Sequence, residues 1–161
     1  MAVFKMSKDF NDIQEPRLMP EDWYLMRVSK EPTQDPNTAM REGGTEADNA
    51  GYSIVVNLRA EVDDPEFNGR GFRFYLSLPN ATDEGLYVNG QPKADWKEEL
   101  IAKVTAVFHG YQASQWKELP GDEAEISEGM KAEFYVTQEL SRDGQRTINA
   151  INVLNNLPQP A

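Results

Sequence analysis

Apolar and mainly polar residues alternate without interruption over a long stretch near the middle of the chain. One set of alternate positions holds Tyr52, Ile54, Val56, Leu58, Ala60 and Val62. The other set holds Ser53, Val55, Asn57, Arg59 and Glu61. Successive side chains of a β-strand point to opposite faces, so this pattern predicts a long strand with one buried face. It commits the middle of the chain to a β-sheet.

Four further segments have strand character and predict a mainly β fold. Asn68 and Gly69 give a strong turn signal, after which residues 70–78 alternate as a partner strand. Its inward positions are Phe72, Phe74, Leu76 and Leu78, and its outward positions are Arg73, Tyr75 and Ser77. The other predicted strands are Trp23 to Ser29, Met130 to Gln138 and Thr147 to Leu154, the last two joined by a hairpin turn at Ser141 to Gly144.

One helix is predicted between the third and fourth strands. Asp95 and Glu98 fit a capping box, with Asp95 as the N-cap, so the helix is expected to run from Trp96 to about His109. Gly110 is a natural stop signal. The remaining segments, 31–51, 79–92 and 117–129, have no apolar periodicity and are predicted as loops.

The predicted order of elements is three strands, one helix and two strands. This is the order of the OB-fold, a five-stranded, partly open barrel with one helix between strands three and four. The two long alternating strands favour this fold, because the second and third strands of an OB barrel are long. Other small β-barrels and α+β sandwiches have the same element order.

Five segments of the chain resemble a known family. They are Gly51 to Leu58, Asn68 to Phe74, Trp96 to Leu100, Gly129 to Phe134 and Ile148 to Asn152. In these, and over roughly residues 20–157, the chain resembles phage-encoded OB-fold proteins of the single-stranded DNA-binding type. The resemblance implies a role in phage DNA replication or recombination, with single-stranded DNA and replication or recombination proteins as partners. Many such proteins end in an acidic tail with an aromatic tip, which Pro158 to Ala161 does not supply.

The predicted elements divide the chain into three parts. We expect an irregular N-terminal arm over residues 1–22, an OB-fold-like domain over residues 23–157 and a short tail over residues 158–161. The arm and the edges of a β-barrel are compatible with a homo-oligomer. For a phage-encoded protein, the expected location is the host cell cytoplasm. We expect no signal peptide, because residues 1–6 have no long apolar stretch, and no membrane span, because no apolar run approaches the roughly 20 residues that span a bilayer.

Several residue types that enzymes rely on are missing or scarce. The chain has no cysteine and one histidine, His109, which excludes thiolate catalysis, zinc held by cysteine and a site of several histidines in one chain. Neither a phosphate-binding glycine loop nor a nucleophile elbow occurs. We therefore expect a protein that is not an enzyme and has no cofactor, metal or membrane partner.

The formal net charge of −11 argues against a protein that coats duplex DNA, but the distribution of charge matters more than its sum. Acidic residues concentrate in the predicted loops, whereas arginines fall on the outward side of the predicted second and third strands. A groove for single-stranded DNA combines cations with aromatic residues that stack on bases. The candidate nucleic-acid-binding residues are Arg59, Arg70, Arg73, Tyr75, Lys131, Tyr135, Arg142 and Arg146.

Other interpretations of the same residues stay open. Exposed arginines can serve solubility alone, and Phe67 either stacks on a base or covers the end of the barrel. Asp63, Asp64 and Glu66 form either a solvated turn or a cation site. The alternative function is an acidic structural or interaction module of a virion or assembly, which would use the same β-barrel for protein contacts. A metal-dependent nuclease would need a carboxylate cluster that the sequence does not show.

Overall fold

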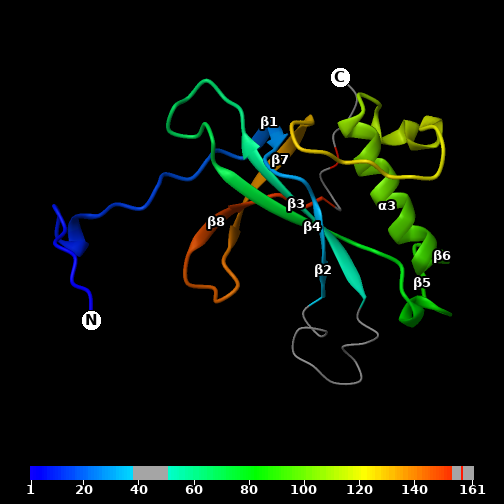
Figure 1. Cartoon of the computed structure of the whole chain (residues 1–161), viewed down its shortest axis with the longest axis horizontal. Helices are drawn as coiled ribbons and strands as arrows, with labels where there is room; N and C mark the ends of the chain where they lie inside the picture. Colours follow the sequence, from blue (N-terminus) through cyan, green and yellow to red (C-terminus); the bar gives the residue numbers. More distant parts are fainter. Residues whose placement is uncertain (38–50, 154–156, 158–161) are drawn as a thin grey trace.

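A curved antiparallel sheet makes up most of the computed structural model, which describes residues 1–37, 51–153 and 157 (Figure 1). Its strands are β1 (Asp22–Val28), β2 (Thr33–Pro36), β3 (Tyr52–Ala60), β4 (Gly71–Ser77), β7 (Lys131–Leu140) and β8 (Thr147–Ala150). A separate small hairpin consists of β5 (Tyr87–Val88) and β6 (Gln91–Pro92). The predicted mainly β class is confirmed.

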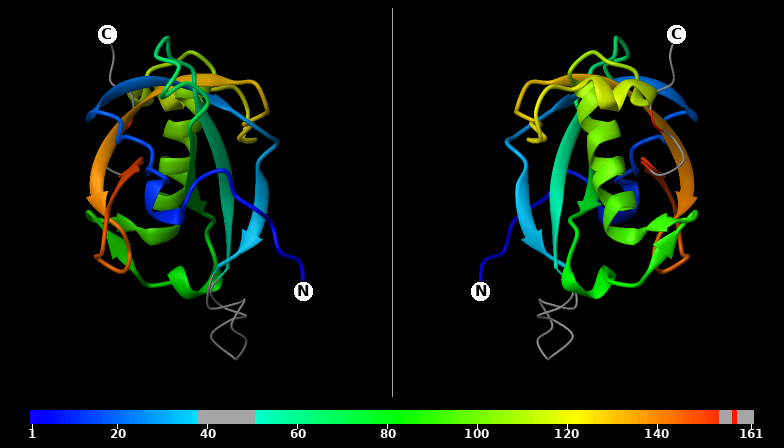
Figure 2. Two further views of the ribbon diagram at one scale, coloured as in Figure 1. Left: turned by 90° about the vertical axis from the view of Figure 1, so that its left-hand side faces the viewer. Right: turned by 90° about the vertical axis from the view of Figure 1, so that its right-hand side faces the viewer.

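Strand β3 connects the parts of the sheet. One edge of β3 pairs with β4, from Ser53 opposite Ser77 to Arg59 opposite Gly71. Its other edge pairs with β2 in its first half and with β1 in its second half. Strand β1 then pairs with β7, and β7 pairs with β8. The sheet curves so that β2 and β7 stand on opposite sides of the view in Figure 2.

The sheet does not close on itself within the described residues. Strands β4 and β8 end the two branches of the pairing, and no ladder joins them in the part of the chain that the structure describes. The described strands number eight, including the short hairpin. The predicted five-stranded, OB-fold-like barrel is therefore not confirmed.

Several predicted boundaries differ from the observed ones. The predicted loop at 31–51 contains β2, and the predicted loop at 79–92 contains the β5–β6 hairpin. Both additions are short and show no apolar alternation. They pair through backbone hydrogen bonds and bury no apolar face, so the sequence pattern gives no signal for them. Residues 38–50 of that first loop, the last residue of the predicted strand to Leu154 and the predicted tail at 158–161 lie outside the described residues.

Helix α3 (Lys93–Phe108) begins before its predicted start, so the predicted capping box is wrong. The N-cap is Pro92, and no side chain caps the first turn. Asp95 lies inside that turn, where a negative charge is favourable to the helix dipole. The helix ends at Phe108, and Gly110 takes a φ of 82° while the Tyr111 N–H donates to the Ala106 carbonyl. This is the predicted glycine stop.

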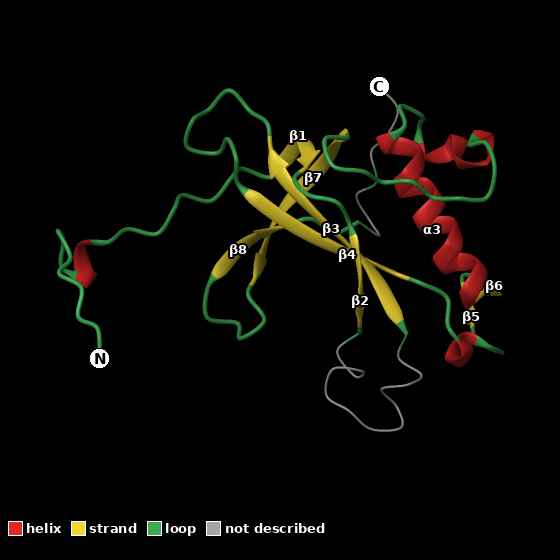
Figure 3. Ribbon diagram, viewed as in Figure 1, coloured by secondary structure: helices red, strands yellow, loops and turns green. Residues whose placement is uncertain are grey.

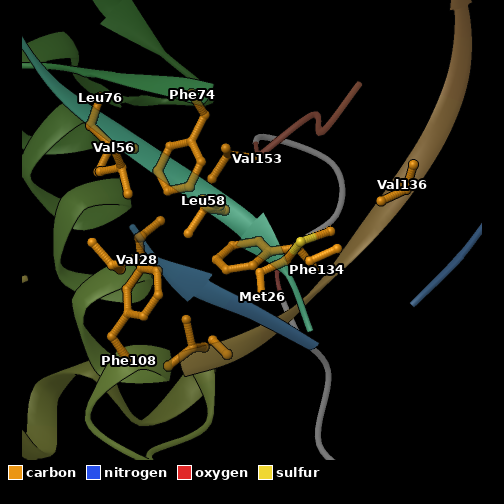
Figure 4. Close-up of a cluster of buried hydrophobic side chains, with 14 of the residues drawn as sticks. Met26, Val28, Val56, Leu58, Phe74, Leu76, Phe108, Phe134, Val136 and Val153 are labelled. Carbon is orange, nitrogen blue, oxygen red and sulfur yellow. The ribbon is translucent and has the colours of Figure 1, made fainter. Parts of the chain in front are cut away.

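The ring of Phe134 on β7 lies at the centre of the core (Figure 4). It is fully buried, with its centroid 5.6 Å from that of Phe74 on β4 and 5.5 Å from that of Phe108 on α3. These contacts join β7, β4 and α3, which no backbone ladder connects directly. Figure 3 shows the strands of the large sheet on one side of the molecule and α3 on the other, with the short β5–β6 hairpin beside the helix.

Residues 17–19 fasten the N-terminal segment to two distant parts of the sheet. Met19 is fully buried, and its backbone bonds to the side chain of Asn149 on β8 and accepts from that of Gln138 on β7. Arg17 pairs with Glu66 in the turn between β3 and β4, at 3.1 Å. The residues before this contact, 1–13, stand away from the sheet in Figure 1.

A buried ion pair joins the connection after β4 to helix α3. The Lys97 Nζ donates to both carboxylate oxygens of Asp83, each at 2.9 Å, and both residues are buried. The Asn80 N–H donates to the same carboxylate. Burial alone would raise the pKa of Asp83, but these hydrogen bonds outweigh it and lower the pKa below its ordinary value.

Truncation of Phe134 tests the core. Phe134→Ala removes the ring that joins β7, β4 and α3, and the cavity is expected to lower the free energy of unfolding by about 3–5 kcal/mol. Urea denaturation measures the change. Tyr87→Ala is the control, since Tyr87 on β5 is 69% exposed and its truncation should leave stability unchanged. Equal stability of the two variants would contradict the described core.

Replacement of Asp83 tests the ion pair through pH. A carboxyl whose pKa is lowered by folding stabilises the fold above its unfolded pKa of about 3.9, and this contribution is lost as the pH falls through the folded pKa. Asp83→Asn is therefore expected to flatten the acid limb of stability against pH. At neutral pH it should cost about 3–5 kcal/mol, because Lys97 stays buried without its partner. Chemical denaturation at several pH values measures both effects, and an acid limb parallel to the wild type's would contradict the assignment.

Candidate nucleic-acid interface

The outer face of β3 and β4 brings three of the predicted site residues together. On β3 the side chains of Val56 and Leu58 enter the core, so that of Arg59 faces outward. The same alternation on β4 turns Arg73 and Tyr75 outward. Tyr75 is 55% exposed, so a large part of its surface is open to solvent.

A shallow groove runs between the two arginines. Its volume is about 480 Å³, and its lining residues are Ser29, Lys30, Asn57, Leu58, Arg59, Gly71, Phe72 and Arg73. Gly71 lies opposite Arg59 in the ladder and has no side chain to fill the space. The glycine that begins β4 therefore leaves this part of the groove open.

Each guanidinium of the groove is held by one hydrogen bond. The Arg73 Nε donates to the Asn57 Oδ1 at 2.8 Å, and the Arg59 Nη1 donates to the Gly69 carbonyl at 2.8 Å. A guanidinium carries five N–H donors, so most donors of each side chain stay available. Both residues are exposed, and a planar guanidinium can donate two parallel hydrogen bonds to two oxygens of an anion such as a phosphate.

Arg27 on β1 also belongs to this face and was not predicted. It lies opposite Arg59 on β3 and opposite Lys131 on β7, which places three cations in one row across three strands. Neighbouring strands are about 4.8 Å apart, so the three charges are close together. The alternation of buried Met26 and Val28 with outward Arg27 was the signal that could have identified it.

Lys131 reaches the face but is already paired. The Glu61 Oε2 lies 2.7 Å from the Lys131 Nζ, and the Glu61 Oε1 accepts from the Arg27 Nε at 3.0 Å. The hydrogen bond from Lys131, together with that from Arg27, lowers the pKa of Glu61. Glu61 therefore neutralises part of the cation row.

Tyr135 lies on the outer face of β7, away from the arginines. It is half-buried and packs edge-on against Trp23 of β1, with ring centroids 5.5 Å apart. The exposed Glu133 stands between Tyr135 and Lys131 along β7, opposite Leu25 in the ladder. The structure thus places one acidic side chain, that of Glu133, between this aromatic pair and the cations.

Arg70 packs against Phe67 rather than facing the groove. Phe67 is buried in the core, and the guanidinium carbons of Arg70 and Arg17 each lie 4.9 Å from its ring centroid. This buried position favours Phe67 as a cover for the core over Phe67 as a residue that stacks on a base. Arg70 belongs to the same cover.

Arg142 and Arg146 lie on the hairpin that joins β7 to β8. Both are exposed, and the Ser141 N–H donates to the Arg146 carbonyl at 2.7 Å. The predicted turn at Ser141 to Gly144 is confirmed, with a φ of 71° at Gly144. Among the described residues, no hydrogen bond or ion pair joins this hairpin to Arg59 or Arg73.

The acidic turn after β3 forms ion pairs with an arginine of the N-terminal segment. Asp64 and Glu66 both pair with Arg17, at 3.7 and 3.1 Å, and their carboxylates remain partly exposed. Within residues 1–37, 51–153 and 157, no group of three or more histidines or acids could hold a metal ion. Asp64 and Glu66 therefore take part in ion pairs that join this turn to the N-terminal segment.

Comparisons with known proteins do not assign this chain to a family. No protein-family model and no curated protein matches the sequence. None of the helices in the described part of the chain has the length and apolar character needed to cross a membrane. An assignment of function therefore depends on the residues of the outer face.

Proposed function

We propose that this protein binds single-stranded DNA without catalysing a reaction. Arg59 and Arg73 contact backbone phosphates, and Tyr75 stacks on a base. The observation that carries the proposal is the combination of three features on one sheet face. These are two guanidinium groups that each donate one hydrogen bond within the described protein, an open groove and an exposed tyrosine. Cations that follow the backbone and aromatic platforms for the bases are the two components of single-strand binding sites.

The strand pairing supports an OB-fold-like architecture as part of this proposal. Strands β1 and β2 pair with the same edge of β3 and count together as one interrupted first strand. Strands β3, β4, β7 and β8 then follow as the second to fifth strands, with α3 between the third and fourth. An OB barrel is partly open and binds oligonucleotides on its second and third strands, which correspond to β3 and β4.

The charge of the chain favours a single strand over a duplex as the ligand. A protein that coats duplex DNA neutralises many closely spaced phosphates, which a chain with a net charge of −11 does not support. Two to four cations in one groove suit a short track of single-stranded backbone. The bases then remain available for Tyr75. A role in phage replication or recombination is the setting that the sequence resemblance suggests.

Two substitutions on the face test this proposal. Tyr75→Ala is expected to cost about 1–3 kcal/mol of binding to oligo-dT, because one stacking platform is lost. Arg73→Glu should weaken binding further and reduce the salt dependence by about 0.7 per lost phosphate contact. Fluorescence anisotropy of labelled oligo-dT at several salt concentrations measures both effects.

Matched controls separate the site from general surface effects. Tyr87→Ala removes a 69% exposed tyrosine on β5, and Lys117→Glu reverses an exposed charge after α3. Both controls should bind like the wild type. If Arg73→Glu and Tyr75→Ala also bind like the wild type, the binding site does not lie on this face. If the wild type does not bind oligo-dT at low salt, the proposed function is contradicted.

A second candidate function is supported by a different observation. The N-terminal residues expose large apolar side chains, including Phe4 at 82% and Phe10 at 79%. Exposed apolar segments of this kind mark contacts with other proteins. They favour the structural or assembly module, in which the arm contacts neighbouring subunits.

The assembly function predicts that the pure protein self-associates without DNA. Light scattering should then give a mass above the 18.2 kDa of one chain. The double substitution Phe4→Ser and Phe10→Ser should return it to a monomer, because the apolar contacts are lost. A wild-type protein that remains monomeric at high concentration would contradict this function and leave single-strand binding.

A further inference from the structure

Glu61 occupies a position between two cations on the outer face. Its two carboxylate oxygens bind different partners, the Arg27 Nε at 3.0 Å and the Lys131 Nζ at 2.7 Å. The partners come from β1 and β7, which are adjacent strands, and both side chains remain partly exposed to solvent. Glu61 itself follows the end of β3, with its N–H donating to the Leu25 carbonyl.

This arrangement has the geometry of a site for a bridging anion. A backbone phosphate carries one negative charge and two free oxygens, as a carboxylate does. The Arg27–Lys131 pair that holds the two oxygens of Glu61 can therefore hold those of a phosphate with no net change in charge. Arg59 lies beside Arg27 in the ladder, so the position continues the groove formed by Arg59 and Arg73.

The free protein needs an anion at this position. Like charges placed opposite one another on neighbouring strands destabilise a sheet, and Arg59, Arg27 and Lys131 form such a row. Glu61 offsets this repulsion. Exposed ion pairs contribute little net stability, so a phosphate can displace the carboxylate at low cost.

We propose that Arg27 and Lys131 form a binding position for a DNA phosphate. In the free protein the Glu61 carboxylate occupies this position, so it competes with the phosphate for the two cations. The inference rests on the proposed single-strand function and extends its site from β3 and β4 to β1 and β7. Glu61 thereby limits the affinity of the face and favours release of the strand.

Glu61→Gln tests the proposal because it removes the competing charge and keeps the shape of the side chain. The variant should bind oligo-dT about threefold or more tightly at about 50 mM salt, with a salt dependence steeper by about 0.7 for the phosphate now neutralised. Glu133→Gln is the matched control. It makes the same charge change on the same face, and in the described structure Glu133 bonds to neither Arg27 nor Lys131, so its gain should be markedly smaller.

A double-mutant cycle assigns the gain to the cations. Lys131→Gln should weaken binding more in the Glu61→Gln protein than in the wild type, because Glu61 no longer shields Lys131. The proposal would be overturned by equal effects of Lys131→Gln in the two backgrounds, or by equal gains from Glu61→Gln and Glu133→Gln. Either result would leave the proposed function standing, because the wild type would still bind oligo-dT. Absence of oligo-dT binding by the wild type and all variants would instead overturn the proposed function together with this inference.

A measurement on the wild-type protein does not depend on the folding of any variant. The NMR resonance of the Arg27 Nε–H should shift when oligo-dT is added, as phosphate replaces the Glu61 carboxylate. The Arg17 side chain, which pairs with Glu66 in the turn after β3, is the internal control and should not shift. An unchanged Arg27 resonance in a sample that binds oligo-dT would overturn the proposal.

Discussion

The contact of Phe134 with Phe74 and Phe108 is the interaction on which the arrangement of the sheet depends. Strands β4 and β7 share no hydrogen-bond ladder, so apolar packing keeps the two branches of the sheet over helix α3. This packing takes up the inward residues of β3, β4 and β7. The outward side chains of Arg59, Arg73 and Tyr75 take no part in this packing and stay exposed, which is the condition for a binding face.

In the proposed account, the charges on that face meet two opposing requirements: they attract an anionic strand, and they limit the affinity for it. A chain with a net charge of −11 must hold several cations close together to attract an anionic strand. Asn57 orients Arg73 through a hydrogen bond, and Glu61 separates Arg27 from Lys131 by binding both. In the proposed account, the first contact prepares the groove for phosphate and the second restrains its affinity.

The sequence predicted those parts of the fold and site that depend on alternation within one strand. The outward positions of Arg59, Arg73 and Tyr75 followed from the buried residues between them. Arg27 was missed because β1 alternates imperfectly, and β2 was missed because it pairs without burying a face. The bond of Glu61 to Lys131 joins residues far apart in the sequence, so it depends on strand order, which local patterns do not determine.

A comparison of single-stranded and duplex DNA tests the central claim most directly. Fluorescence anisotropy would follow the binding of labelled oligo-dT, and of a duplex of equal length, to the wild-type protein at low and near-physiological salt. The account predicts tight, salt-sensitive binding of oligo-dT and weaker binding of the duplex, because the face offers few cations and an exposed tyrosine. Equal binding of both, or no binding of either at low salt, would contradict it.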